Sequence, residues 1–211
     1  MTTTSDPSLR GTRLPRSERR AQLLEAARGV FVERGYHAAA MDEIAVRAGV
    51  SKPVLYQHFP GKLDLYLALL DMSIDEFVAS VVEALDSTHD NKRRVAAAME
   101  TFFAFVGGEG DTFRLLFEND LTNAEAVRGR LDALTRRCAE AIAPVIAEDT
   151  GLSAEESQLL AAGMVGMAQV AARFWLASDG SLPRSDATSL IATLGWRGIR
   201  GFPRRDGERH E

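Results

Sequence analysis

Residues 51–59, SKPVLYQHF, combine the side-chain types that contact DNA with the spacing of a very short helix. Leu55 and Phe59 lie four residues apart, so on a helix they share one face and the polar residues face away from it. Lysine and glutamine suit base edges or phosphates, whereas tyrosine hydroxyls and histidine N–H groups suit phosphate oxygens. The pattern predicts a helix with a packed inner face and a nucleic-acid-binding outer face.

Two further helices must position this one. Apolar residues at helical spacing predict a helix over 17–34, which Gly35 ends, and a short helix over 41–48, which Gly49 ends. Ser51 suits the N-cap of the next helix, and Pro53 suits its first turn. Residues 17–62 therefore predict a helix-turn-helix domain, with the motif itself at 40–59 and its second helix in the major groove.

The rest of the chain also predicts one helix after another. Apolar stripes at helical spacing recur in segments 62–85, 92–106, 113–117, 123–149, 155–176 and 186–201. We therefore expect an all-α fold with about nine helices. It divides into a flexible basic arm at 1–16, the domain at 17–62 and a helical body at 63–211.

Charge separates these regions. The formal net charge is −5, which alone argues against nucleic acid. Residues 1–62, however, hold ten Lys or Arg and six Asp or Glu, giving +4, and residues 63–211 carry the remaining −9. Such asymmetry is a recognised hint of nucleic-acid or membrane contact.

The sequence lacks the signatures of several other classes of protein. The single cysteine, Cys138, excludes a disulfide framework and a cysteine-based zinc site, and the histidines lack ligand spacing. No phosphate loop, GxSxG elbow, HExxH helix or CxxC pair occurs, so we expect no catalytic site and no cofactor. We find neither a secretory signal nor an apolar run of about 18 residues, and expect a cytoplasmic protein without membrane contact.

The N-terminal sequence resembles the DNA-binding domain of the TetR family of bacterial regulators. The elements AxxxFxxxGY, IAxxAGVS, LYxHF and GKxxL all occur at family spacing within ARGVFVERGYHAAAMDEIAVRAGVSKPVLYQHFPGKLDLY. The resemblance implies a homodimer that binds a double-stranded DNA operator and a small lipophilic effector. It also implies that 63–211 is a ligand-binding and dimerisation domain.

The resemblance assigns roles to individual residues. Ser51, Lys52, Pro53 and Val54 occupy the variable start of the recognition helix, and Gln57 faces outward on it. Tyr56, His58 and Lys62 are expected to contact the phosphate backbone. Arg47 would add a contact from the preceding helix. A phosphate is also favoured at Lys62 by the N-terminus of the following helix. The alternative roles are that His58 is a surface histidine without a contact, that Tyr56 is a core tyrosine and that Pro53 only initiates its helix.

A narrower resemblance covers most of the chain. The N-terminal region, FRLLFEND and the final LGWRGI look like actinobacterial regulators of fatty-acid synthesis. This implies long-chain acyl-CoA as effector and fatty-acid synthase genes as target, and leaves activation and repression open. Two alternatives remain: a repressor of an efflux or catabolic operon sensing another lipophile, and a helical interaction module or enzyme without a DNA role.

An apolar pocket in the body would hold the effector. Aromatic and other apolar residues with few charges suggest a tunnel for an acyl chain, which gains roughly 0.8 kcal/mol per buried CH2 group. An ordinary core is the alternative. The candidate ligand-binding residues are Phe102, Phe103, Val106, Phe113, Leu116, Phe117, Leu134, Cys138, Met164, Gln169 and Phe174.

Two C-terminal segments, 155–176 and 186–200, carry small and apolar residues that let helices approach closely. Doubled by two-fold symmetry, they would form a four-helix bundle between two subunits. The alternative is that the same stripes pack inside one subunit.

Overall fold

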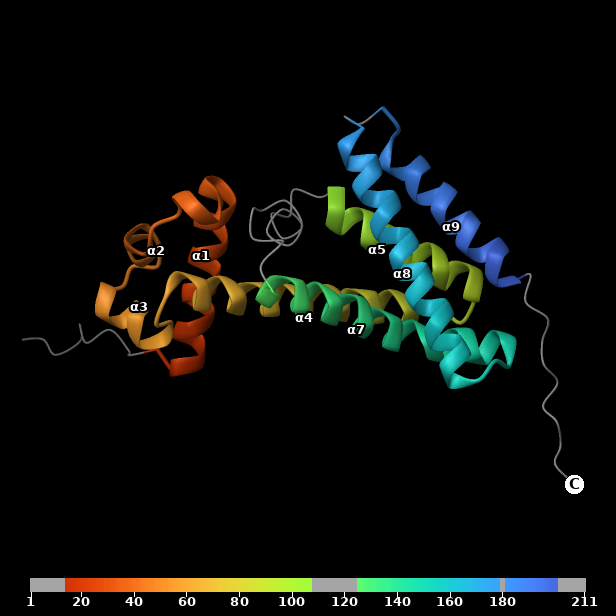
Figure 1. Ribbon diagram of the computed structural model, residues 1–211, viewed down its shortest axis with the longest axis horizontal. Helices are drawn as coiled ribbons and strands as arrows, with labels where there is room; N and C mark the ends of the chain where they lie inside the picture. Colours follow the sequence, from red (N-terminus) through yellow and green to blue (C-terminus); the bar gives the residue numbers. More distant parts are fainter. Residues whose placement is uncertain (1–13, 108–124, 179–180, 201–211) are drawn as a thin grey trace, which may run out of the picture. The chain divides into compact units, whose positions relative to one another are not determined.

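The computed structural model describes residues 14–107, 125–178 and 181–200 (Figure 1). These residues form helices and no strand, which confirms the all-α class. The helices are α1 (Arg16–Ala38), α2 (Met41–Arg47), α3 (Lys52–His58), α4 (Lys62–Asp86), α5 (Asn91–Gly107), α7 (Glu125–Thr150), α8 (Ala154–Ala177) and α9 (Arg184–Arg200). That makes eight described helices instead of about nine, because the short helix expected at 113–117 lies outside the described residues.

The chain forms two compact units, Met1–Tyr66 and Leu67–Glu211. The helix α4 begins in the first unit and continues into the second. We call the first the DNA-binding unit and the second the body.

Aromatic packing holds the DNA-binding unit together. The Tyr66 ring lies 5.2 Å from that of Phe31 and 5.1 Å from that of Tyr36, both in edge-on contact. The side chain of Gln22 donates a 2.9 Å hydrogen bond to the Ala48 carbonyl, which fixes α1 to the turn after α2. The rings thus join α1 to the start of α4, and the hydrogen bond braces the end of α2 against α1.

Two glycines set the chain direction in this unit. Gly35 has φ 72° and Gly49 has φ 64°, values that other residues rarely adopt. Gly49 makes the turn between α2 and α3, as expected. Gly35 interrupts α1 as predicted, but helical structure resumes and α1 ends at Ala38, four residues after the predicted end.

The body is a layered helical bundle in which α7 packs on α8, and α5 packs on both α8 and α9. The body portion of α4 joins this bundle through long side chains. The Phe77 ring lies 5.5 Å from that of Phe102 and 4.2 Å from that of Phe105, both on α5. Asp71 and Asp75 form ion pairs at 2.8 and 2.6 Å with Arg130 and Arg137 of α7, respectively.

The helix α8 corrects one expectation. It is long and apolar enough, by length and composition, to cross a membrane, although no such run was expected. A mostly buried core helix of a soluble protein passes the same test, whereas only 22 % of this apolar window is buried in the body. Here α8 begins with a capping box between Ser153 and Glu156 and packs against three other helices of the body.

Candidate nucleic-acid interface

The short helix α3 has the two faces that its spacing predicts. Leu55 is 0 % exposed and Phe59 is 2 % exposed. The outward residues are Ser51, Lys52, Pro53, Tyr56 and Gln57, with Val54 and His58 half-buried at the edge. Ser51 occupies the N-cap but its side chain makes no capping hydrogen bond. Ser51 is exposed, and no capping bond engages its hydroxyl.

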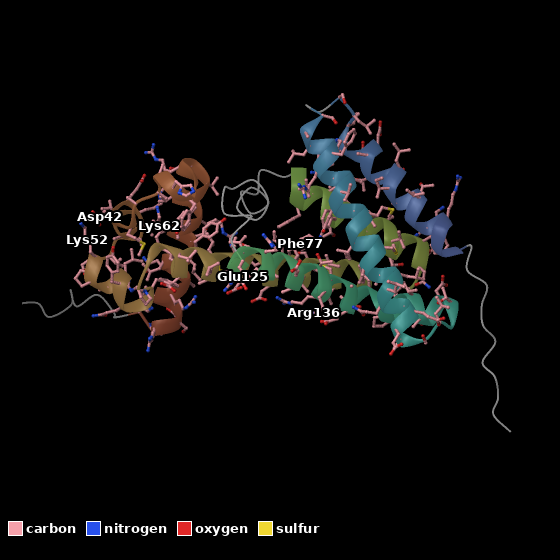
Figure 2. The ribbon with its side chains drawn as sticks, in the orientation of Figure 1. Asp42, Lys52, Lys62, Phe77, Glu125 and Arg136 are labelled. Carbon is pink, nitrogen blue, oxygen red and sulfur yellow. The ribbon has the colours of Figure 1, made fainter. Side chains whose placement is uncertain are left out.

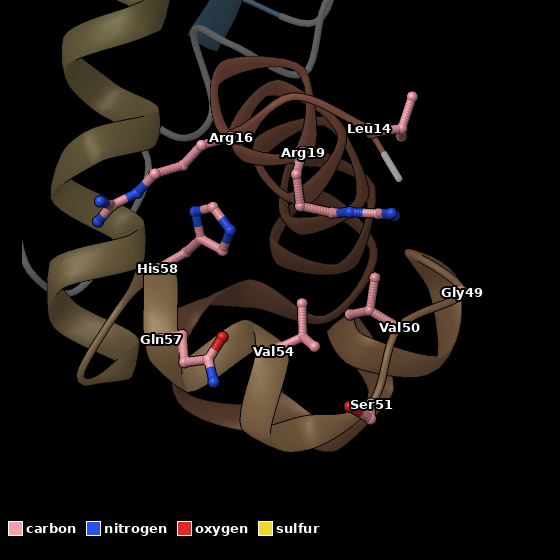
Figure 3. A pocket seen from close by; sticks show the side chains of 9 residues that line it. All are labelled: Leu14, Arg16, Arg19, Gly49, Val50, Ser51, Val54, Gln57 and His58. Carbon is pink, nitrogen blue, oxygen red and sulfur yellow. The ribbon is translucent and has the colours of Figure 1, made fainter. Parts of the chain in front are cut away.

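A groove runs between α3 and the start of α1 (Figure 3). It has a volume of about 650 Å³, and four predicted DNA-binding residues line it: Ser51, Val54, Gln57 and His58. Arg16 and Arg19 line the opposite side. The sequence placed Arg16 in the flexible basic arm and assigned neither arginine a place beside α3. Their position at the first turn of a helix that packs on the motif was the signal that could have placed them.

His58 titrates in a positive environment. Burial is the larger cause that lowers its pKa from 6.5, followed by the positive charges of Arg16, Arg20 and Arg19. The imidazole is therefore neutral at neutral pH. A phosphate brought to this groove would offset the arginine charges and favour protonation of the ring.

The cations of α2 and α3 have acidic partners. Arg47 makes a two-pronged ion pair with Glu33 of α1, with N–O distances of 2.7 and 2.6 Å, and this lowers the pKa of Glu33. The Arg47 guanidinium also lies against Gly29, where a β-carbon would stand 2.5 Å from Nη1. Lys52 Nζ lies 2.5 Å from Asp42 Oδ2. Thus the predicted phosphate contact of Arg47 requires that it leave, or share, Glu33.

Lys62 makes several contacts within the DNA-binding unit (Figure 2). Its ammonium donates hydrogen bonds of 3.1 and 3.0 Å to the carbonyls of His37 and Ala39, and lies 4.7 Å above the Tyr36 ring. The lysine thereby ties the start of α4 to the end of α1. A phosphate contact at Lys62 stays a prediction, to which the structure adds this second role.

The predicted ligand-binding residues divide into groups. Five are buried in the body: Phe102, Phe103, Val106, Leu134 and Cys138. Gln169 is half-buried and donates a 3.0 Å hydrogen bond to Thr135. Met164 lines an apolar cavity between α5, α7 and α9 with residues outside the predicted set. Phe174 is 77 % exposed, so the structure does not bring it together with the buried group. Phe113, Leu116 and Phe117 lie outside the described residues.

Cys138 is a free, buried thiol. Burial raises its pKa to about 11, partly opposed by the charge of Arg137. It is therefore a protonated, unreactive side chain, consistent with apolar packing or an apolar ligand. Among the described residues, no three His, Cys, Asp or Glu side chains gather as they would around a metal ion.

Two helices at this spacing, with a buried inner face and a polar outer face, define a helix-turn-helix protein of the DNA-binding class. Residues 23–69 match the bacterial regulatory proteins of the tetR family, and residues 80–208 match the tetracyclin repressor-like C-terminal domain. The chain is 46 % identical over 194 residues to the HTH-type transcriptional activator FasR of Mycolicibacterium smegmatis, covering 92 % of this chain and 89 % of FasR. The chain therefore belongs to the TetR family of DNA-binding transcriptional regulators.

Solved structures share the fold. A TetR-like regulator from Rhodococcus sp. RHA1 is 31 % identical, with a TM-score of 0.66 over 90 % of this chain and 100 % of that one. FadR of Bacillus subtilis, solved in complex with stearoyl-CoA, is 19 % identical, with a TM-score of 0.65 over 83 % of this chain and 96 % of that one. At this identity the FadR likeness establishes the fold alone.

Proposed function

We propose that this protein is a homodimeric regulator of fatty-acid biosynthesis genes whose DNA affinity responds to long-chain acyl-CoA. The observation that carries the proposal is the 46 % identity to FasR over 92 % of the chain. This identity spans both the DNA-binding unit and the body, as does the resemblance to fatty-acid-synthesis regulators. We expect the protein to act in the cytoplasm, where its operator lies.

The body offers the apolar surroundings that an acyl chain needs. Phe102, Phe103, Val106 and Leu134 are all buried there, and Cys138 adds a protonated thiol. Each CH2 group of a chain transferred to such surroundings gains roughly 0.8 kcal/mol. The fold of FadR accommodates stearoyl-CoA, which supports an acyl-CoA in the same kind of body.

The DNA-binding unit supplies the contacts to an operator. Ser51, Lys52, Val54 and Gln57 would face base edges, whereas Tyr56 and His58 would contact the backbone with Arg16 and Arg19 beside them. Two such units in a symmetric dimer read a near-palindrome. Its half-sites should lie about 34–36 Å apart, or a multiple of that.

An exposed apolar stripe on α8 and α9 supports the dimer. Along α8 its members are Leu159, Val170 and Phe174, spaced by Gly163 and Gly166, and along α9 they are Leu190 and Leu194. A β-carbon at either of those glycines would meet open space in this subunit. Exposed large apolar side chains gathered along two helices are typical of an interaction surface, and the glycines would admit a partner helix at close range. We propose that α8 and α9 form a four-helix bundle with their copies.

The helix α4 would carry the ligand response. Phe77 of α4 contacts Phe102, one of the proposed ligand residues. An acyl chain that displaces Phe102 would therefore bias the position of α4, and a ligand shifts an equilibrium only through such a difference between states. Spin labels on the two copies of α3 should change their separation when acyl-CoA binds, and an unchanged separation would count against this route.

The effector test is a titration of the DNA complex. We would measure binding of the full chain to labelled DNA from upstream of fatty-acid synthase genes by fluorescence anisotropy. C16–C20 acyl-CoA should change the affinity in one direction, whereas free CoA and cationic drugs should leave it unchanged. A response to the drugs alone would favour a sensor of other lipophiles, and no response to any acyl-CoA would refute the acyl-CoA proposal. A folded Lys52→Ala variant with reduced binding is the control for contact through α3.

A further inference from the structure

An acidic side chain stands on the proposed DNA-reading surface. Asp42, in the first turn of α2, lies 2.5 Å from the ammonium of Lys52 at the start of α3 (Figure 2). Both side chains are more than half exposed, at 59 % and 60 %. The lysine predicted to contact the operator is thus already paired with a carboxylate.

The pair adds little to the fold. Ion pairs between solvent-exposed side chains contribute little stability, because water screens them and both side chains lose freedom. Asp42 also lies in the first turn of α2, where the helix dipole favours a negative charge. That purely structural role would not affect which DNA the protein selects.

The geometry limits what Asp42 can contact. A group within hydrogen-bonding distance of Lys52 Nζ lies at the same part of the DNA-facing surface. Phosphates repel a carboxylate, so Asp42 cannot serve as a backbone contact. In the major groove a carboxylate can accept a hydrogen bond only from a base amino group, and the cytosine N4 amino group is the usual partner of Asp or Glu.

We propose that Asp42 is a specificity-determining residue of the operator complex. On unmatched DNA its charge repels the backbone and holds Lys52. On the operator, Lys52 donates to a base acceptor, and Asp42 accepts from a cytosine amino group beside it. The inference rests on the proposed operator binding through α3 and deepens it.

The neighbouring residue provides a matched control. Glu43 lies in the same turn of α2 and carries the same charge, but it pairs with Arg34 at 3.4 Å and not with Lys52. Asp42→Asn and Glu43→Gln therefore remove the same charge from the same helix end. Only the first change frees Lys52.

The experiment compares these variants of the full chain. Each would select from a pool of randomised duplexes, and its affinity would be measured for the duplex that the wild type selects and for a mixed-sequence duplex of equal length. Asp42→Asn should bind the mixed-sequence duplex more tightly. Its ratio of selected to mixed affinity should fall about tenfold, with relaxed preference at one cytosine per half-site. Glu43→Gln should keep the wild-type ratio within about twofold.

The outcomes separate the two proposals. An Asp42→Asn protein with the wild-type ratio and base preference overturns this inference while operator binding stands. An equal loss of specificity in Glu43→Gln also overturns the inference, because any acidic charge at this end of α2 would then have the same effect. A wild type that selects no sequence from the pool refutes both proposals. Asp42→Ser, which also suits a helix start, replaces Asp42→Asn if thermal melting shows that variant unfolded.

Discussion

The DNA-binding unit and the body present different surfaces. Around α3 the exposed side chains are mainly polar, and cations such as Lys52 and Arg47 have acidic partners. On α8 and α9 a stripe of large apolar side chains, including Val170 and Phe174, meets solvent. The DNA-binding unit exposes Val46 as well, but scattered single apolar residues are ordinary.

This difference indicates two kinds of partner. Paired charges on a hydrated surface can be exchanged for phosphates and base edges at small cost, and salt concentration tunes the exchange. Covering an exposed apolar stripe with another apolar surface is favourable, because it removes both surfaces from water. The first surface therefore suits DNA, and the second suits a copy of the same chain.

The largest expected effect is the loss of the dimer when the apolar stripe can no longer pair with its copy. Phe174→Asp should give a monomer, because it places a charge in the proposed bundle. Operator affinity should then fall by about 100-fold or more, since two linked sites bind that much more tightly than one. Light scattering and anisotropy measure the two quantities together. Phe174→Leu is the matched control, and a dimeric Phe174→Asp protein would place the interface elsewhere.

The next effect compares the removal of a lysine from the DNA-binding unit with the removal of a lysine from the body. Lys52→Ala should weaken operator binding about tenfold, the usual value of one good base contact. Lys92→Ala, which removes an exposed lysine from α5 of the body, should leave affinity unchanged. Equal losses in the two variants would mean that only overall charge matters, and that α3 does not read the operator.

Lys62 tests whether one residue serves both fold and DNA. Lys62→Met removes the hydrogen bonds to the carbonyls of His37 and Ala39 at the end of α1. It should lower the stability of the DNA-binding unit by about 1–3 kcal/mol, visible in a thermal melt. If the ammonium also reaches a phosphate, the slope of log K against log salt concentration should weaken by about 0.9 for each of the two copies in the dimer. An unchanged salt slope would make Lys62 a purely structural residue.

The smallest effect is a pH dependence of DNA binding. The pKa of His58 is lowered from 6.5 in the protein, so folding loses stability as pH falls through 6.5 toward the lowered value. A phosphate in the groove would raise this pKa again, so DNA binding takes up a proton. Affinity should therefore rise a few-fold more between pH 8 and pH 6 in the wild type than in His58→Gln. Equal pH profiles would exclude contact at His58.

Sequence patterns predicted what local spacing determines. The buried face of α3 follows from Leu55 and Phe59, and the turn before it from Gly49. The pairing of Lys52 with Asp42 depends instead on how α2 and α3 cross, which no spacing along either helix reports.

The body was less predictable for the same reason. An apolar stripe on α8 marks a face but not what covers it, so Phe174 was assigned to the ligand although its ring is exposed. The same composition made α8 pass the length and hydropathy test for a membrane span. Phe103 is buried, as both a core residue and a pocket-lining residue would be, because an apolar ring leaves water in either role.

Native mass spectrometry of the protein, its selected operator duplex and stearoyl-CoA tests the central claim most directly. We predict that the protein dimer forms two complexes, one with a single duplex and one with acyl-CoA. The fraction of dimer in each of these complexes, and in any ternary complex, should change as acyl-CoA is added. A dimer that binds DNA in the same proportion at every acyl-CoA concentration would contradict the account, as would a monomer that binds neither.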